Sequence, residues 1–287
     1  MLTNLAIWLI LALLMLGAFW SARRAWTSSR GMGIRVAGTV GASLLALALC
    51  AVLVVSAKGM STMYLAQAVP VPAVRIAGTP GQLARGEYLV RIACVGCHGD
   101  EKLPLTGGLD FASEVPFPIG KLVAENIAPD GKISEYSDGE IFRVLRHGIG
   151  KDGRYRALMM GMPYRQLGDE DLMAIIAYLR RSPPSNSAAR GGDHLNLIAM
   201  AMLGAGLIPQ PDPPTPGVIT APALGRTATY GRYVATFGEC RGCHGPELKG
   251  EPAGVAGPAT PNLRATLPTW TREQFVQAMR TGKRPDG

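Results

Sequence analysis

The sequence has little of what most enzymes and nucleic-acid-binding proteins use for their chemistry. Only four His occur in 287 residues, and aromatic residues make up 6% of the chain. No Ser/His/Asp set, glycine-rich phosphate loop or metal-hydrolase motif is present, so hydrolysis and phosphoryl transfer have no candidate residues. Lys and Arg form no tract of the kind that binds nucleic acid, and we expect no nucleic-acid partner.

Acidic residues are absent from the first 57 positions, which carry four Arg instead. Those residues are Arg23, Arg24, Arg30 and Arg35. Since the whole chain has a formal charge of +8, the other 230 residues hold 25 basic and 21 acidic groups. Half of the net charge of +8 therefore belongs to a short N-terminal segment.

Two apolar runs lie on either side of these Arg. Leu2–Trp20 has about 19 residues and Val36–Ser56 about 21, and a membrane-spanning helix needs about 20. The loop between them, Ser21–Arg35, holds all four Arg, so the positive-inside rule places it in the cytoplasm. A cleaved signal peptide is the alternative for the first run, although no basic residue precedes its apolar core. We predict that residues 1–57 anchor the chain in the lipid of the inner membrane by two spans, with the rest on the periplasmic side.

Proline-rich stretches divide the remainder of the chain. Residues 58–80 are typical of a tether, and residues 186–224, with six Pro from Pro209 to Pro222, of a linker. Inside that linker, His194–Ile208 is apolar but too short to cross a bilayer. We expect it to form a helix that packs on a domain face or on a partner. The predicted domains are then residues 81–185 and 225–287.

An internal repeat relates these two predicted domains. Each copy has a Cys pair followed by His-Gly, a later Asn with an aliphatic neighbour, and a capping-box pattern that marks the start of a helix. The matched features, first copy against second, are Gly86-Glu87-Tyr88-Leu89 and Gly231-Arg232-Tyr233-Val234, Asn126-Ile127 and Asn262-Leu263, and Ser137-x-x-Glu140 and Thr271-x-x-Gln274. The repeat predicts two related, mostly α-helical domains.

Four of the five Cys form two C-x-x-C-H motifs, at residues 94–98 and 240–244. This spacing is typical of covalent haem c attachment, in which the two thiols add to the porphyrin vinyl groups and the His binds iron. Zinc or a dithiol redox pair is the alternative for C-x-x-C, but zinc would need further ligands and neither needs the adjacent His. We predict two haem c, attached at Cys94 and Cys97 and at Cys240 and Cys243, with His98 and His244 as iron ligands.

The sixth ligand of the first iron is expected from a Met-rich segment. Met159, Met160 and Met162 precede a predicted helix, Asp169–Arg181, whose apolar residues recur at i, i+3, i+4 and i+7. A Met thioether raises the potential of a haem and closes its iron to small ligands.

The stretch from Met162-Pro163-Tyr164 to Asp171-Leu172, followed by Ala177-Tyr178-Leu179, resembles the axial-Met loop and last helix of class I cytochromes c. In small bacterial members, the ligand Met lies about 16 residues before the aromatic residue of the last helix. Met162 lies 16 residues before Tyr178. Residues 126–180 also resemble the multihaem cytochrome subunits of periplasmic alcohol, aldehyde and gluconate dehydrogenases. In those proteins the Met can lie further from the helix, which would select Met160 or Met159. The resemblance implies two class I cytochrome c-like domains, which follow the two transmembrane helices predicted from the apolar runs. The helical hairpin itself departs from those dehydrogenase subunits.

The second copy lacks an equivalent Met. Met279 is the only Met in residues 225–287, and it falls in the helix that corresponds to Ile141–Arg146. We expect the chain to continue beyond Gly287 and the sixth ligand of the second haem to lie outside this sequence. A ligand from a partner and an open iron site are the alternatives.

Together these patterns predict an electron-transfer protein rather than an enzyme. The expected function is a membrane-anchored dihaem relay in a respiratory or photosynthetic complex. Its partners would be a membrane redox complex, namely a dehydrogenase, an oxidase or a reaction centre. A peroxidase-like dihaem enzyme with one open haem is the main alternative, and a redox or gas sensor is a weaker one.

Overall fold

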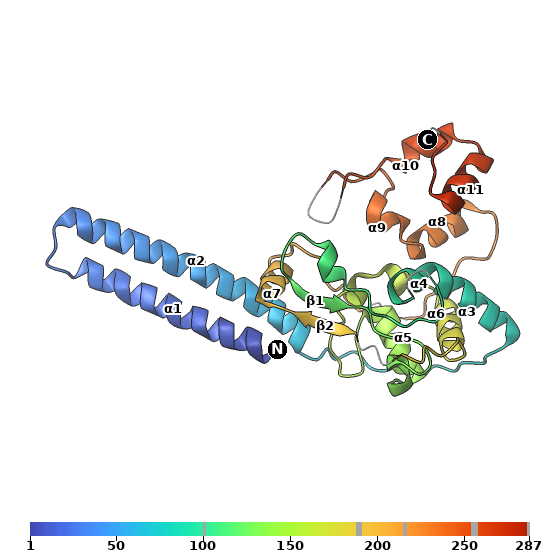
Figure 1. The fold of residues 1–287 in the computed structure, drawn as a ribbon, viewed down its shortest axis with the longest axis horizontal. Helices are drawn as coiled ribbons and strands as arrows, with labels where there is room; N and C mark the ends of the chain where they lie inside the picture. The colour runs from blue at the N-terminus through green and yellow to red at the C-terminus, as the bar shows by residue number, and fades with distance from the viewer. Residues whose placement is uncertain (100–101, 188–190, 215–216, 254–257, 286–287) are drawn as a thin grey trace.

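The computed structural model describes all residues except 100–101, 188–190, 215–216, 254–257 and 286–287, and it is mostly helical. A long helical hairpin leads into a body of short helices, and a further group of helices lies over one side of that body (Figure 1). The α-helices are α1 (Leu2–Trp26), α2 (Met32–Tyr64), α3 (Pro80–Ala93), α4 (Val95–His98), α5 (Asp138–His147), α6 (Asp169–Leu179), α7 (Leu197–Gly204), α8 (Ala228–Phe237), α9 (Cys240–His244), α10 (Leu263–Thr266) and α11 (Arg272–Thr281). The 3-10 helices are η1 (Phe111–Glu114), η2 (Lys132–Glu135), η3 (Met159–Gly161), η4 (Pro163–Gln166) and η5 (Leu267–Thr269), and the strands are β1 (Gly120–Val123) and β2 (Gly192–Leu195).

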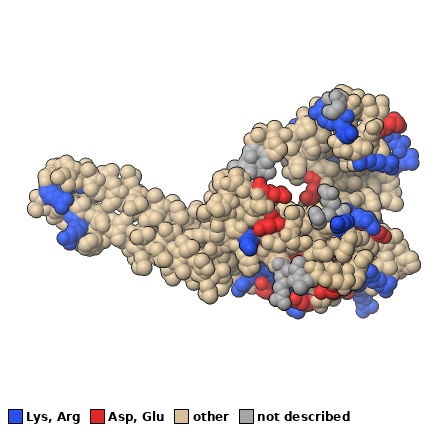
Figure 2. All heavy atoms as spheres, in the orientation of Figure 1, with Lys and Arg blue, Asp and Glu red and all other residues tan. Residues whose placement is uncertain are grey.

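The hairpin of α1 and α2 is the N-terminal part of the molecule. Both helices are long and apolar enough to cross a membrane, with mean hydropathies of 2.3 and 2.5, and both leave most of their surface open. The connection is shorter than the predicted loop, because α1 continues to Trp26 and α2 begins at Met32. The space-filling view shows an uncharged shaft with basic side chains gathered near its far end (Figure 2). Helix α2 also runs on to Tyr64, so residues 58–64 of the predicted tether are helical.

The main core lies between α3, α5 and α6. Leu89 and Val90 of α3 and Leu172 and Ile176 of α6 are fully buried against one another. Their helices cross at Gly86, where an added Cβ would lie 2.0 Å from the carbonyl oxygen of Ala174. A larger residue at Gly86 would push the two backbones apart, whereas a Cβ at Gly231, the matching position of the second copy, would meet nothing within 4 Å.

The predicted helix His194–Ile208 is replaced by a strand followed by a shorter helix. Strand β2 pairs antiparallel with β1, with Gly120 opposite Leu195. Asn196 then begins α7, because its side chain accepts hydrogen bonds from the backbone N–H groups of Ile198 and Ala199. Helix α7 packs against α2, so this part of the predicted linker joins the first body of helices to the membrane hairpin.

The C-terminal group of helices repeats the local features of the first. Both capping boxes form, at Ser137 with Glu140 and at Thr271 with Gln274. The helices that they begin, α5 and α11, both end at a Gly in the left-handed conformation, with φ of 66° and 69°. Helix α5 buries its apolar face against α6, whereas α11 exposes Phe275, Val276 and Met279.

Candidate haem site

The first C-x-x-C-H motif follows α3 directly and opens onto an apolar cavity. Cys94 ends α3 and begins the one-turn helix α4, which carries Cys97 and His98. The cavity has a volume of about 380 Å³, within the range of roughly 300–1,000 Å³ that small-molecule and cofactor sites occupy. Its lining includes Cys94, Cys97, His98, Ile127, Ile133, Tyr136, Ile141, Val144, Leu145, Met159, Met162, Tyr164 and Leu179.

His98 is held in the orientation that an iron ligand needs. Its Nδ1 lies 2.7 Å from the carbonyl oxygen of Glu125, so that nitrogen carries the proton and Nε2 is left with a free lone pair. Burial also lowers the pKa of His98, which favours the neutral ring. Beside it, burial raises the pKa of the Cys94 thiol to about 12. Loss of hydration on burial is the main cause of both shifts.

Two of the three candidate Met side chains face the cavity. Met159 and Met162 line it, at the two ends of η3. Met160 is also buried, but it packs in a separate cluster with Met63, Met200 and Leu203, near the membrane hairpin. Met160 therefore points away from the cavity that Met159 and Met162 line.

Arg146 holds the segment that follows Met162, and sequence reasoning missed it. Its guanidinium donates to the carbonyl oxygen of Leu167 at 2.7 Å and to the carboxylate of Asp169 at 2.5 Å. The side chain is 4% exposed, so these acceptors replace water around a buried charge. The internal repeat could have pointed to Arg146, because Arg280 occupies the matching position of α11.

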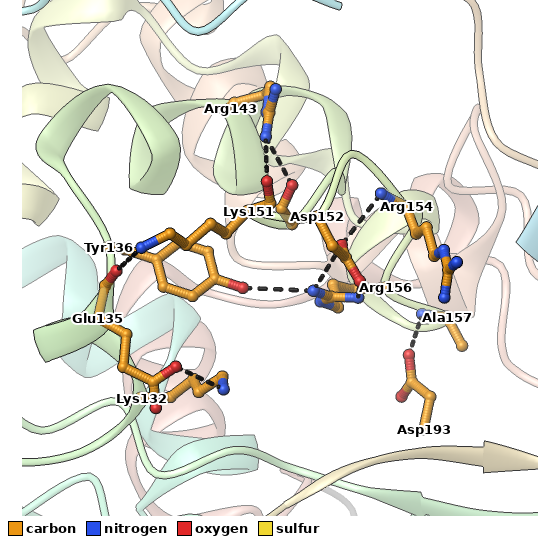
Figure 3. A network of polar contacts seen from close by, with 11 residues as sticks. Lys132, Glu135, Tyr136, Arg143, Lys151, Asp152, Arg154, Arg156, Ala157 and Asp193 are labelled. Carbon is orange, nitrogen blue, oxygen red and sulfur yellow. Dashed lines mark hydrogen bonds and ion pairs between the residues drawn. The ribbon is translucent and has the colours of Figure 1, made fainter. Parts of the chain in front are cut away.

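One side of the cavity is polar (Figure 3). Lys132, Arg154 and Arg156 line it, and Arg156 donates to the Tyr136 hydroxyl at 3.3 Å and to Asp152 at 2.9 Å. The cavity thus joins an apolar interior to a polar edge that carries basic and acidic side chains, and Lys132, Arg154 and Arg156 are the groups there that could pair with the two propionates of a porphyrin. The residues present fit a haem c, with Cys94 and Cys97 for its vinyl groups and His98 for its iron.

Asp193 faces the same edge from strand β2, inside the predicted linker. Its carboxylate accepts from the backbone N–H of Ala157 at 2.7 Å and lines the cavity. Burial raises the pKa of Asp193, and burial also raises the pKa of Glu125 nearby. Only the β1–β2 pairing brings residue 193 to this site, so no sequence-local signal could have found it.

The membrane hairpin completes the cavity wall. Met1, Met63 and Tyr64 line it, from the ends of α1 and α2 that lie against the first body of helices. Asn4 of α1 donates to the Tyr64 hydroxyl at 2.7 Å and to the carbonyl oxygen of Leu195 at 2.9 Å. The cavity is therefore placed at one end of the hairpin, opposite the Arg-rich turn.

The second motif reproduces the geometry of the first around its His. The Nδ1 atom of His244 lies 3.0 Å from the carbonyl oxygen of Pro261, the residue before Asn262. The partner of His98 is likewise the residue before Asn126. Thr260 adds a hydrogen bond to the carbonyl oxygen of Cys243 at 2.7 Å. The surroundings are more open, since Cys243 is exposed.

Comparisons with known proteins agree with the site. Residues 81–179 match the family described as cytochrome c oxidase, cbb3-type, subunit III. The gluconate 2-dehydrogenase cytochrome c subunit of Pantoea cypripedii is 30% identical over 69% of this chain and 51% of its own length. The cytochrome c subunit of the quinone alcohol dehydrogenase of Gluconobacter oxydans (strain 621H) is 28% identical over 70% of this chain and 47% of its own length.

A third relative covers less of the chain. The fructose dehydrogenase cytochrome subunit of Gluconobacter japonicus is 34% identical over 43% of this chain and 27% of its own length. The chain spans about half the length of the first two relatives. The chain therefore contains a cytochrome c domain, and it is a homologue of the cytochrome c subunits of gluconate, alcohol and fructose dehydrogenases.

Proposed function

We propose that the chain is a dihaem c-type cytochrome that transfers electrons as the membrane-anchored subunit of a dehydrogenase complex. The proposal of two haems rests on the matching backbone contacts of His98 and His244. His98 and His244 each follow a C-x-x-C pair, and each sets its Nδ1 against the carbonyl that precedes a repeated Asn. A zinc or dithiol site would not need this arrangement twice.

At the first site, the proposed roles follow from position. Cys94 and Cys97 would hold the porphyrin through thioether bonds, and His98 and Met162 would be the iron ligands. Bound haem would supply a one-electron Fe(II)/Fe(III) couple, and the residues of this chain form and break no covalent bond during transfer. Lys132 and Arg156 could pair with the haem propionates, and the apolar wall would keep water from the iron.

The relatives' names support a dehydrogenase as the electron donor. All three are cytochrome subunits of dehydrogenases that oxidise small organic substrates, so a catalytic subunit would supply the electrons. The proposed electron acceptor is an oxidase or a reaction centre, as expected from the sequence. The Arg-rich turn supports a cytoplasmic end for the hairpin, which leaves both haem motifs on the periplasmic side of the inner membrane.

A second candidate function rests on the second motif. Within residues 225–285, outside the gap at 254–257, the only Met is Met279, which is 66% exposed on α11. If neither another segment nor a partner supplied a ligand, the second haem would have an open iron, as a peroxidase-like enzyme requires. Binding of CO to the reduced native protein would favour this function, and its absence would favour electron transfer alone.

The number of haems per chain tests the main proposal directly. We expect the purified native protein to carry two covalent haems per chain. The ratio is measured from the absorbance of the pyridine haemochrome and the total protein concentration. The variant Cys240→Ser/Cys243→Ser should retain one haem, and so should Cys94→Ser/Cys97→Ser. A native protein with a single haem, unaffected by the Cys240→Ser/Cys243→Ser change, would overturn the dihaem proposal.

A further inference from the structure

The two haem motifs meet at one buried side chain. Tyr164, in η4, is 4% exposed and lines the first haem cavity. Its hydroxyl lies 2.7 Å from Oε1 of Glu239, and it also contacts the carbonyl oxygen of Ala93. Ala93 precedes Cys94 and Glu239 precedes Cys240, so Tyr164 touches the same position of the repeat in both motifs.

A packed and hydrogen-bonded interface holds this contact in place. Phe237, at the end of α8, is 1% exposed and belongs to the main core, where its ring stacks edge-on against Tyr88 and Tyr233. Tyr233 donates to Asp171 of α6 at 2.6 Å and accepts from the backbone N–H of Gly168 at 2.9 Å. The helices of the second motif are therefore seated on the first body rather than tethered loosely beside it.

Glu239 adopts an unfavourable backbone conformation to make this contact. Its φ is 59°, a left-handed conformation that residues other than Gly, Asn and Asp rarely adopt. Strain of this kind persists only where the surrounding structure enforces it, and it concentrates at functional positions. Here the conformation places the carboxylate on Tyr164 while the next residue begins the second Cys pair.

The geometry points to Tyr164 and Glu239 as the residues that couple the two haem sites electronically. This inference rests on the proposed dihaem function. From Cys94 to Cys240 the connection consists of covalent bonds and the two oxygen contacts of the Tyr164 hydroxyl, whose single proton is shared between the carbonyl oxygen of Ala93 and the carboxylate of Glu239. Electrons tunnel more readily along bonds and hydrogen bonds than across a van der Waals gap. One electron passes from a ferrous centre to a ferric one, and no bond or proton changes.

The negative charge of Glu239 adds a second consequence. Its half-buried carboxylate contacts Tyr164, which lines the first cavity. A negative charge at this position stabilises Fe(III) over Fe(II) in the first haem. Glu239, a residue of the second motif, therefore lowers the potential of the first haem.

The experiment follows electron redistribution between the haems after flash photoreduction of the full-length, detergent-solubilised protein. Tyr164→Phe should slow the redistribution several-fold, because it removes the hydroxyl that joins the motifs. Tyr230→Phe is the matched control, since it removes an interface hydrogen bond from Arg85 at 2.9 Å that touches neither motif. We expect Tyr230→Phe to redistribute at the native rate.

A second pair of variants separates the charge from the contact. Glu239→Gln keeps an oxygen acceptor, so it should redistribute electrons near the native rate while the midpoint potential of the first haem rises. Glu239→Ala removes the acceptor and should slow the redistribution as well. Native rates in both Tyr164→Phe and Glu239→Ala, or equal slowing in Tyr230→Phe, would overturn the inference. A native protein with one haem and no redistribution phase would instead refute the dihaem function.

Discussion

At the scale of single residues, the first site divides into groups that bind and groups that tune. Cys94, Cys97 and His98 form a local motif whose chemistry is readable from their spacing. Other side chains reach the cavity from distant parts of the chain, namely Met162, the proposed sixth ligand, from the loop before α6 and Asp193 from β2, which would tune the potential. Each kind of residue leads to a different measurable effect.

The identity of the sixth ligand can be tested by comparing two Met. Met162→Ala should lower the midpoint potential of the first haem and open its iron to CO, because a thioether ligand is lost. Met159→Ala is the control, since it also lines the cavity but is expected to pack against the haem edge. Spectropotentiometric titration and CO difference spectra measure both effects. The reverse pattern would assign Met159 as the ligand.

Asp193 should make the potential of the first haem depend on pH. Burial raises its pKa above the usual 3.8, although Arg156 and His194 oppose the shift. As pH rises through this raised pKa, the carboxylate becomes charged and stabilises Fe(III), so the midpoint potential should fall. The folded state also binds the proton more tightly than the unfolded chain, so stability declines over the same pH window.

Substitution of Asp193 by Asn provides the comparison for this pH dependence. Asp193→Asn keeps an oxygen acceptor for the backbone N–H of Ala157 but cannot ionise. Its potential should change less with pH than that of the native protein, measured by titrations at a series of pH values. Glu125 also has a raised pKa beside Asp193, so Glu125→Gln shows how much dependence it contributes. An identical pH slope in native protein and Asp193→Asn would exclude Asp193.

At the scale of elements, α5 positions the Met loop. Its capping box and C-terminal Gly define its ends, and its apolar side packs against α6. From its last turn, Arg146 reaches the backbone of the loop and the first turn of α6. Helix α5 therefore determines where Met162 lies, although it carries no iron ligand.

Weakening this link should loosen the Met ligand without removing it. Arg146→Lys keeps the charge, but an ammonium group cannot reproduce the planar geometry that serves Leu167 and Asp169 together. We expect the Met–iron charge-transfer band to disappear at a lower temperature than in the native protein. Arg91→Lys is the control, because Arg91 forms an exposed pair with Glu87 within α3. Equal thermal behaviour of the two variants would remove Arg146 from this role.

At the scale of the whole molecule, the crossing of α2 and α7 joins the first body of helices, which contains the cavity, to the hairpin. An added Cβ at Gly59 would lie 1.9 Å from the carbonyl oxygen of Met200, and one at Gly204 would lie 1.7 Å from that of Val55. The two backbones are thus in direct contact, with no room for a side chain between them. This contact holds the cavity at one end of the hairpin (Figure 1).

Substitutions at this crossing should separate the two parts. Gly204→Ala should destabilise the contact by about 1–3 kcal/mol, the usual cost of overpacking. Its thermal midpoint in detergent should fall, and hydrogen exchange in α7 should increase. Gly41→Ala is the control on α2, because a Cβ there meets nothing within 4 Å. If both variants matched the native protein, the crossing would not hold the first body of helices in place.

The sequence by itself determined the features whose physical causes are local. Apolar length predicted the two membrane helices, C-x-x-C-H spacing predicted the haem motifs, and hydroxyl–carboxyl pairs predicted the starts of α5 and α11. Tertiary structure decided which Met face the cavity, that residues 192–204 pack on the hairpin, and that Asp193 and Tyr64 reach the site. These outcomes depend on contacts between residues far apart in the chain, and only packing in three dimensions selects among such contacts.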